Sequence, residues 1–416
     1  MLTETDPSDP GRDSAVDAPG DDPDDETPPP PPARPIRPGR RSALLARWGF
    51  PLALVLLAVV TVVLALIGRD AILDSTEGDV VRVVTDPAAP GFRVLVEPTP
   101  SALWVLIDDD DALIGLVVAG LADPEGGGGI GVLPARATTS DLDGRTFADL
   151  YAEEGLDSLA PTVAATLDIG FGDVAVIDAR QWEALFAPVA PLTVSLATDL
   201  VAEDGTVVYP AGDVEVAAAD VAAVLAWESP GDPAQARVIR QGTILSVYLD
   251  ALSEVGPDVV PGEGDVGVPL FLRSFARGSH VVLVPETTES DGALVADLDE
   301  VRDLAIDLVP FPLPAEPGGR PTVRLLDGVG DQAMTLSIAD TLVRAGAQVS
   351  VLGNAEEFDV VATTIEYHTE AARQVAEEFR SALGVGTVTF VPLAADSETS
   401  FVSVTVTVGS DAGEAG

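Results

Sequence analysis

Three arginines are the side chains of this sequence whose type and spacing could carry chemistry. Arg237 and Arg240 stand three positions apart, a spacing that places two side chains on one face of a helix. Guanidinium groups hold phosphate through charge-assisted hydrogen bonds, so this pair could bind a phosphate group. The pair could equally form ion pairs with surface carboxylates. Arg136, which follows an apolar run, is open to the same two interpretations.

Four consecutive aspartates, Asp108 to Asp111, are a second candidate for chemistry. Their carboxylates could bind a metal ion. They stand between two apolar runs, however, and neighbouring side chains in a hairpin point in different directions. A solvated turn is therefore favoured over a metal site.

The composition excludes several classes of site and partner. The chain has 416 residues, no cysteine and only two histidines, which are His280 and His368. Disulfides, zinc–thiolate centres and thiol nucleophiles are therefore excluded, and histidine-rich metal sites are disfavoured. The formal net charge is −46, and all 22 basic residues are arginine. Because binding to nucleic acid needs a basic surface, we expect no nucleic-acid partner.

The start of the chain predicts a tail and a membrane anchor. Residues 1–47 are acidic and rich in proline and end in a basic cluster, which predicts a disordered tail. Residues 48–68 are uncharged and would span about 31 Å as a helix, the thickness of the membrane hydrocarbon layer. The alternatives are a cleaved signal peptide or a buried core helix. A signal peptide has a shorter apolar region, so we predict a transmembrane helix.

Arginines are unevenly distributed about this apolar segment. Five arginines precede it, whereas Arg69 is the only one close behind it. Because the cytoplasmic flanks of membrane helices are rich in basic residues, the tail should be cytoplasmic and the rest of the chain extracytoplasmic. We therefore predict a single-pass protein of the cell membrane, with a juxtamembrane segment at residues 69–89.

Residues 90–314 alternate helical patterns with apolar runs rich in β-branched residues. This alternation predicts a mixed α/β domain outside the cell. The glycine run from Gly126 to Gly129 predicts a flexible loop, because no Lys-Ser or Lys-Thr pair follows it as in a phosphate-binding loop. The prolines and glycines before residue 322 predict a linker at residues 315–321.

Residues 322–412 predict a second, smaller α/β domain. The segment from Asp331 to Ala345 has an apolar stripe at helical spacing and is followed by Gly346, a common helix terminator. The segment from Val402 to Val408 alternates valine with serine or threonine, as a half-buried strand does. Together they indicate a compact β-α-β unit with additions, large enough to fold alone.

This last region resembles the C-terminal domain of the LytR type. The motifs that carry the resemblance are Val323-Arg324-Leu325-Leu326-Asp327-Gly328, Arg344-Ala345-Gly346, Gly353-Asn354-Ala355, Thr363-Thr364-Ile365 and Val406-Thr407-Val408-Gly409-Ser410-Asp411. They follow the order of the family and cover nearly the whole domain. Asp327 is a departure, because the family usually has asparagine there. The resemblance implies no particular chemistry for this domain.

Residues 90–314 resemble the LytR-CpsA-Psr domain, which typically follows one N-terminal membrane helix. Two segments are similar to the family's Pro-Arg-Asp-Thr strand end and to its Arg-x-x-Arg-Gln motif. They are Val132-Leu133-Pro134-Ala135-Arg136-Ala137-Thr138 and Arg237-Val238-Ile239-Arg240-Gln241. The resemblance therefore implies a set of ligand-binding residues. These are Arg136, Arg237, Arg240 and Gln241.

The same resemblance implies a reaction and a metal ion. Catalytic members of the family transfer glycopolymers from polyprenyl pyrophosphate carriers to the cell wall, with Mg²⁺. The catalytic candidates would be the three arginines together with Asp232, just upstream of the second motif. Asp111, ahead of Leu113, stands where the family has a metal-binding aspartate.

Departures from the family pattern argue against catalysis. Ala137 stands where an aspartate is expected, and the run from Glu228 to Gly231 replaces a pair of arginines. Holding a pyrophosphate needs several arginines, and one well-placed electrostatic group contributes roughly 3–4 kcal/mol to catalysis. We therefore predict a non-catalytic binding or assembly factor in cell-wall biogenesis.

Two alternatives stay open at this point. One is an active transferase that uses Mg²⁺ and moves a glycopolymer from a polyprenyl pyrophosphate carrier to the cell wall. The other is a structural docking protein of the envelope. The partners expected are the membrane and, beyond it, a polyprenyl-linked glycopolymer, peptidoglycan or another envelope protein.

Overall fold

The computed structural model describes most of the chain beyond residue 83. The described residues are 84–121, 126–138, 142, 144–233, 235–262, 266–290, 293–393 and 400–414. The predicted tail at residues 1–47 and the predicted transmembrane helix at residues 48–68 lie outside them. Within the described ranges, no helix combines the length and the apolar character needed to cross a membrane.

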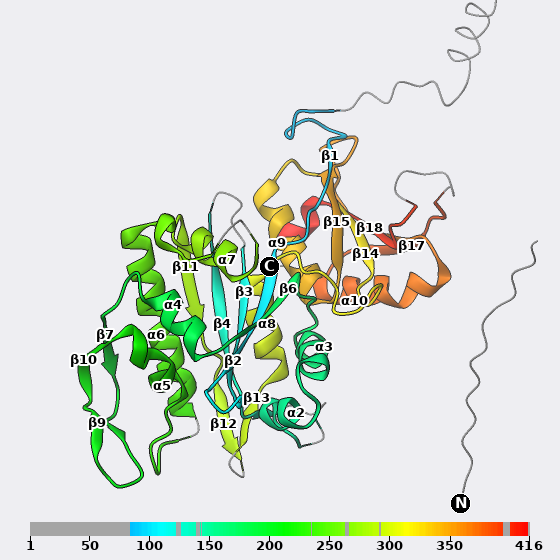
Figure 1. The fold of residues 1–416 in the computed structure, drawn as a ribbon. Helices are drawn as coiled ribbons and strands as arrows, with labels where there is room; N and C mark the ends of the chain where they lie inside the picture. Colours follow the sequence, from blue (N-terminus) through cyan, green and yellow to red (C-terminus); the bar gives the residue numbers. More distant parts are fainter. Residues whose placement is uncertain are drawn as a thin grey trace, which may run out of the picture. The chain divides into compact units, whose positions relative to one another are not determined.

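A five-stranded mixed sheet forms the centre of the first part of the fold (Figure 1). Its strands are β2 (Ser101–Ile107), β3 (Leu113–Gly120), β4 (Gly127–Pro134), β6 (Asp173–Ile177) and β11 (Ser279–Leu283). The order across the sheet is β11-β4-β3-β2-β6, and β3 alone is antiparallel to both of its neighbours. The carboxyl ends of the other four strands therefore meet at one edge of the sheet.

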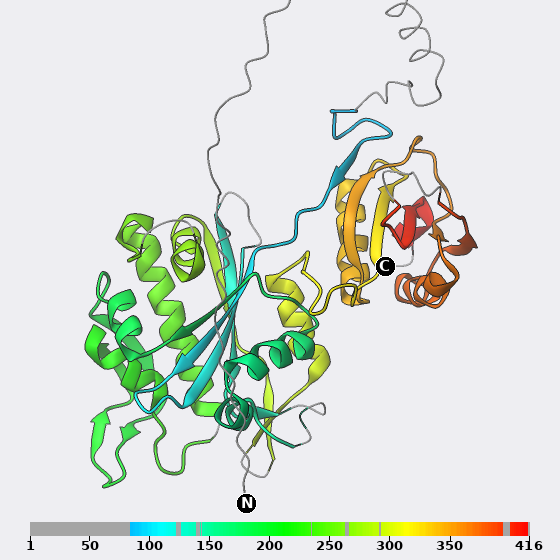
Figure 2. The same cartoon turned by 45° about the vertical axis from the view of Figure 1, so that its right-hand side comes forward.

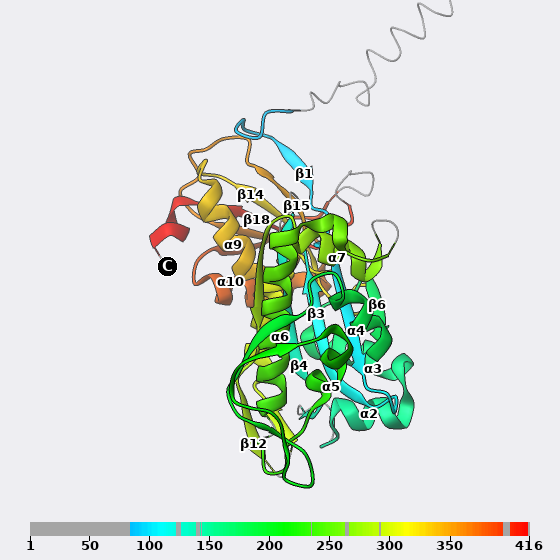
Figure 3. The same cartoon turned by 60° about the vertical axis from the view of Figure 1, so that its left-hand side comes forward.

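Helices cover both faces of this sheet (Figures 1 and 3). One face is covered by α4 (Ala179–Phe186), α5 (Val221–Ala226), α6 (Gln235–Val255) and α7 (Gly267–Phe275), and the other by α2 (Phe147–Glu154), α3 (Leu156–Leu167) and α8 (Leu298–Leu308). Side chains of a strand point alternately to its two faces. Trp104 of β2 therefore packs in the core under α4–α7, while Leu103 and Val105 pack in the opposite core. The predicted mixed α/β class is confirmed for this part of the chain.

Smaller strands complete this part of the fold. A three-stranded sheet consists of β5 (Ala137–Thr138), β12 (Thr287–Ser290) and β13 (Ala293–Ala296). Two antiparallel pairs are formed by β7 (Leu192–Leu196) with β10 (Gly212–Val216) and by β8 (Leu200–Val201) with β9 (Val207–Tyr209).

The prediction of a flexible loop from Gly126 to Gly129 is wrong, because the last three of these glycines begin β4. The strand needs glycine because its neighbours come closer than a side chain would allow. A Cβ atom on Gly128 would lie 2.1 Å from the carbonyl oxygen of Gly120. A glycine run indicates flexibility, but glycine also permits the close backbone approach seen in this strand.

The end of the chain forms most of a six-stranded sheet. Its strands, in spatial order, are β1 (Arg93–Leu95), β15 (Gln348–Asn354), β14 (Thr322–Asp327), β18 (Val404–Val408), β16 (Thr364–Tyr367) and β17 (Thr387–Phe390). The helices α9 (Gln332–Arg344) and α10 (Arg373–Leu383) bury Leu342 and Phe379 in its core. The predicted helix at residues 331–345 and the predicted strand at residues 402–408 are confirmed.

One strand of this sheet comes from far upstream in the sequence. β1 pairs antiparallel with β15, and Figure 2 shows the two strands side by side. The side-chain amide of Asn354 fixes the preceding segment, since it donates to the carbonyls of Pro87 and Ala89 at 2.9 and 2.7 Å. The sequence assigned residues 69–89 to a juxtamembrane segment and began the first domain at residue 90. It gave no sign that residues 87–95 join the C-terminal sheet.

The predicted linker at residues 315–321 contains a buried arginine. The Arg320 side chain is 3% exposed and pairs with Oδ2 of Asp168 at 2.9 Å. Its N–H groups also donate to the main-chain carbonyls of Asp168, Val343 and Ala347. The linker is therefore held by hydrogen bonds to the end of α3 and to the segment that ends α9.

Candidate functional site

Two of the candidate arginines gather where the five-stranded sheet ends. β2 ends just before Asp108, and β4 ends just before the turn that carries Arg136. Arg237 lies in the first turn of α6, which packs against β4 and β11. Because β2 and β4 run in the same direction, the fold brings these residues to one edge although they are far apart in the sequence.

A carboxylate of the chain joins two of the arginines. Oε2 of Glu228 lies 3.2 Å from Nη2 of Arg136, and Oε1 of Glu228 lies 2.8 Å from Nη1 of Arg237. The side chains are 45% exposed for Glu228, 49% for Arg136 and 15% for Arg237. The position between the two guanidinium groups, where an anion would bind, is therefore occupied by Glu228.

Further carboxylates influence the same arginines. Burial lowers the pKa of Arg237, the charges of Glu228 and Asp108 oppose this change, and the charge of Arg136 adds to it. Hydrogen bonds from its helix N-cap lower the pKa of Asp149, and the charge of Arg136 contributes to that decrease. Three carboxylates thus act on two guanidinium groups, so the edge of the sheet carries no positive excess at these residues.

Arg240 does not present its guanidinium group to solvent. The residue is 6% exposed, its Nε donates to the carbonyl of Val224 at 3.0 Å, and its Nη2 donates to the carbonyl of Trp227. Val224 lies in the last turn of α5 and Trp227 directly follows it, where a helix leaves acceptors without internal partners. Burial lowers the pKa of Arg240, an effect that the charge of Asp232 opposes. Arg240 therefore donates hydrogen bonds to backbone carbonyls at the end of α5.

Arg240→Ala is expected to lower the free energy of unfolding by about 2–3 kcal/mol, because two buried carbonyls lose their donor. Urea unfolding followed by tryptophan fluorescence measures the change. Arg237→Ala is the control: it removes an ion pair to a half-exposed carboxylate and should cost less than about 1 kcal/mol. Unchanged stability together with lost affinity for a polyprenyl pyrophosphate would contradict this structural role of Arg240.

Gln241 is also a structural residue. It is 1% exposed, and its Nε2 donates to the carbonyls of Ile114 and Leu225 at 3.0 and 3.1 Å. It comes so close to β3 that a Cβ atom on Gly115 would lie 2.8 Å from its Oε1. Gln241 therefore connects α6 to β3 and to α5 and has no surface to offer a ligand.

Asp232 lies in the loop that precedes α6. Its Oδ2 is buried and has no hydrogen-bond partner among the described residues. The nearby charge of Arg240 offsets part of the cost of burying this carboxylate. The structure therefore places Asp232 beside Arg240, whereas Arg136 and Arg237 share Glu228.

The aspartate run forms a turn. Oδ1 of Asp108 accepts hydrogen bonds from the N–H groups of Asp110 and Ala112, and the N–H of Asp111 donates to the carbonyl of Asp108. Asp111 has a φ angle of 59°, which aspartate tolerates in tight turns. In the ranges that the structure describes, no group of three histidine, aspartate or glutamate side chains could hold a metal ion. One carboxylate oxygen of Asp108 is used within the turn.

The contacts of Glu228 are the feature of this site that the sequence did not predict. The sequence identified this residue as a departure from the family, but its pairing with Arg136 spans 92 positions. One local signal was available, because Glu228 stands in the short loop directly before the helix that carries Arg237. An acidic residue in that loop can reach the first turn of the helix.

Comparison with known proteins identifies the end of the chain. Residues 320–411 match the family model described as LytR cell envelope-related transcriptional attenuator. The resemblance of this region to the LytR type, stated above from its motifs, is therefore confirmed. No curated protein matches the chain.

Several solved structures are similar to the chain. TagV of B. subtilis is 14% identical, with coverage of 51% of this chain and 98% of that chain and a TM-score of 0.39. The LytR-CPS2A-psr family protein YwtF (TagT) of B. subtilis, with bound octaprenyl pyrophosphate lipid, is 19% identical, with coverage of 51% and 91% and a TM-score of 0.39. The LytR-Csp2A-Psr enzyme from Actinomyces oris is 18% identical, with coverage of 52% and 94% and a TM-score of 0.38. Residues 320–411 thus match the LytR C-terminal family, and the solved structures similar to the chain include LytR-CpsA-Psr proteins.

Proposed function

We propose that this protein is an envelope protein of the LytR-CpsA-Psr type that binds or assembles wall components without catalysing glycopolymer transfer. In this proposal, residues 48–68 anchor it in the cell membrane with the described part outside. The observation that supports the absence of transfer is the position of Glu228, whose carboxylate contacts both Arg136 and Arg237.

The electrostatic argument concerns the anion that a transferase would have to hold. A pyrophosphate between Arg136 and Arg237 would meet the carboxylate of Glu228 at hydrogen-bond distance from both guanidinium groups. Like charges at about 4 Å repel by roughly 4 kcal/mol at the effective dielectric constant of a protein surface. Partial exposure of Glu228 reduces this value, but the sign of the interaction opposes binding. Arg240 cannot compensate, because its guanidinium group is buried against the end of α5.

An assay of turnover tests the proposal. The purified full chain is incubated with Mg²⁺, a glycan-linked polyprenyl pyrophosphate and peptidoglycan as the acceptor, and release of the polyprenyl phosphate product is followed over hours. We expect no release above that of a heat-denatured sample. Turnover that depends on Mg²⁺ and disappears in Arg237→Ala would contradict the proposal and indicate an active transferase.

The transferase is the second candidate, and one observation favours it. Arg136 and Arg237 lie close enough to share one carboxylate, so they could also share one phosphate group if Glu228 moved away. Arg136 is half exposed, which gives a ligand access to its guanidinium group. The two functions therefore differ in one property, namely whether Glu228 stays between the arginines when an anionic lipid is present.

A further inference from the structure

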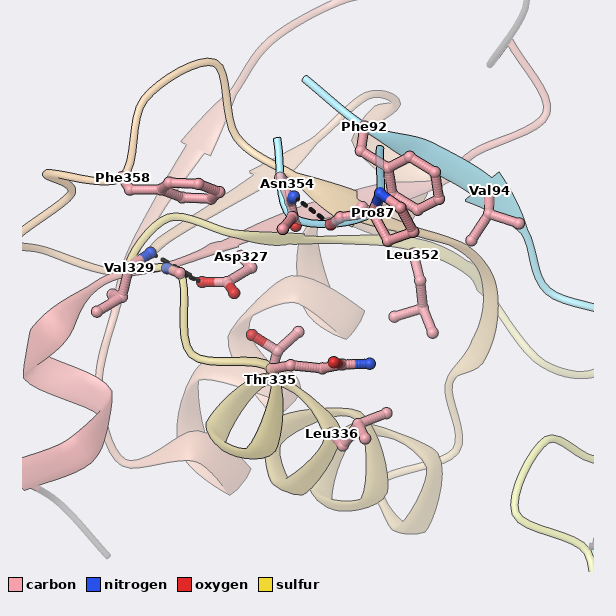
Figure 4. A pocket seen from close by; sticks show the side chains of 14 residues that line it. Pro87, Phe92, Val94, Asp327, Val329, Thr335, Leu336, Leu352, Asn354 and Phe358 are labelled. Atoms are coloured by element: carbon pink, nitrogen blue, oxygen red, sulfur yellow. Dashed lines mark hydrogen bonds between the residues drawn. The ribbon is translucent and has the colours of Figure 1, made fainter. Parts of the chain in front are cut away.

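A pocket in the C-terminal part of the chain is open to a ligand. It lies between the start of α9, the ends of β14 and β15, and the segment that carries β1 (Figure 4). Its volume is about 540 Å³, which is within the range of small-molecule sites. Much of its wall is apolar and includes Phe92, Leu336, Leu352 and Phe358. The pocket shares no residue with the arginine site.

Asp327 gives this pocket a negative charge. Among the described residues that line the pocket it is the only charged side chain. It is 5% exposed, and its Oδ1 accepts hydrogen bonds from the N–H groups of Val329 and Gly330, both at 2.8 Å. Figure 4 shows the carboxylate between Thr335 and the loop of Val329. These two N–H groups satisfy Oδ1 but do not neutralise the charge of the carboxylate, so the pocket favours a cation over an anion.

The start of α9 does not reverse this preference. A helix N-terminus attracts anions when its N–H groups are free. Here Oδ1 of Asp331 accepts from the N–H of Met334 at 3.1 Å, and Asp327 accepts from the two N–H groups of the preceding loop. The chain's own carboxylates therefore use three of the N–H groups at this helix start, and their charges would repel an anion.

Among the other polar side chains of the pocket, the amide of Gln332 can both donate and accept, while Thr335 and Asn354 are left as acceptors. The hydroxyl of Thr335 donates to the carbonyl of Asp331 at 3.1 Å, so its oxygen can only accept from a ligand. The amide nitrogen of Asn354 donates to the carbonyls of Pro87 and Ala89, which leaves the amide oxygen as its free group. An ammonium ion has three donors and no acceptor, which is the complement of this set.

We propose that this pocket binds a primary amine as its ammonium ion, carried on a small apolar or aromatic body. Asp327 is the charge partner of the ammonium, and the amide oxygen of Asn354 and the hydroxyl of Thr335 are neighbouring acceptors. The apolar walls contact the body of the ligand.

Two probes of nearly equal shape test the proposal. Benzylammonium and benzyl alcohol are each titrated into the full chain at pH 7 and followed by calorimetry. Benzylammonium should bind at least about tenfold more tightly, because a charge-assisted hydrogen bond is stronger than a neutral one. Asp327→Asn keeps an oxygen for the loop of Val329 and removes the charge, so it should abolish the difference between the probes.

Two further variants make the result interpretable. Glu356→Gln removes an exposed carboxylate that pairs with Arg93 outside the pocket, and it should leave both affinities unchanged. Leu336→Trp fills the pocket from a half-exposed position on α9 and should prevent binding of both probes even if Asp327→Asn fails to fold. Equal affinities for the two probes, no binding of either probe, or binding by Leu336→Trp would overturn the proposal.

Discussion

Replacing Arg320 by alanine is expected to lower the free energy of unfolding by about 3 kcal/mol. The guanidinium group is buried, pairs with Asp168 and donates to three main-chain carbonyls. The variant would leave the carbonyls of Val343 and Ala347 without these donors and would create a cavity at the linker. Because Asp168 is 42% exposed, water stabilises its freed carboxylate, so we expect the lower end of the range for broken buried pairs.

Urea unfolding of the purified chain measures this change, with Arg344→Ala as the matched control. Arg344 also joins two helices, since it pairs with Asp303 and Asp307 of α8 from its place on α9. Its partners are more than half exposed, so its removal should cost only about 1 kcal/mol. If both variants lose the same free energy of unfolding, then the burial of Arg320 does not add to its contribution to stability.

Glu228→Gln is expected to raise the affinity for a short-chain polyprenyl pyrophosphate by at least about tenfold, or roughly 1.4 kcal/mol. The substitution removes the negative charge between Arg136 and Arg237 and keeps the size of the side chain. Removing a like charge beside a bound phosphate is worth several kcal/mol in a low-dielectric site and less at a half-exposed one. Fluorescence or calorimetric titration of parent and variant measures the change.

A control variant with the same change in net charge separates this local effect from the effect of the protein's total charge. Glu215→Gln changes the net charge equally, at an exposed position of β10. Its affinity for the lipid should equal that of the parent chain. If Glu228→Gln binds no better than Glu215→Gln, then Glu228 does not block the arginines, and the argument for a non-catalytic protein loses its main support.

Local patterns in the sequence predicted much of the fold. The alternation of valine with serine and threonine gave β18, and the apolar stripe with its terminal glycine gave α9. The aspartate run was expected to form a turn, as Asp108 and Asp111 do. These features depend on residues only a few positions apart, so their physical causes can be read directly from the sequence.

Features that depend on distant contacts could not be predicted in this way. The glycines of β4 were misread because the backbone of Gly120 that comes so near Gly128 belongs to another strand. The family motif included Arg240 among the ligand-binding residues, but its burial against α5 follows from packing. The same is true of Glu228, because an ion pair between loops depends on how the sheet brings them together.

The pairing of β1 with β15 affects how the protein can be cut and pulled. Truncation before residue 322 would remove β15 and expose the unpaired backbone of residues 91–96, so such a shortened protein should aggregate more readily. A pulling force applied to the chain at residue 84 would act on the β1–β15 hydrogen bonds before it acted on β2. The hydrogen bonds between β1 and β15 would then break before the force reached the five-stranded sheet.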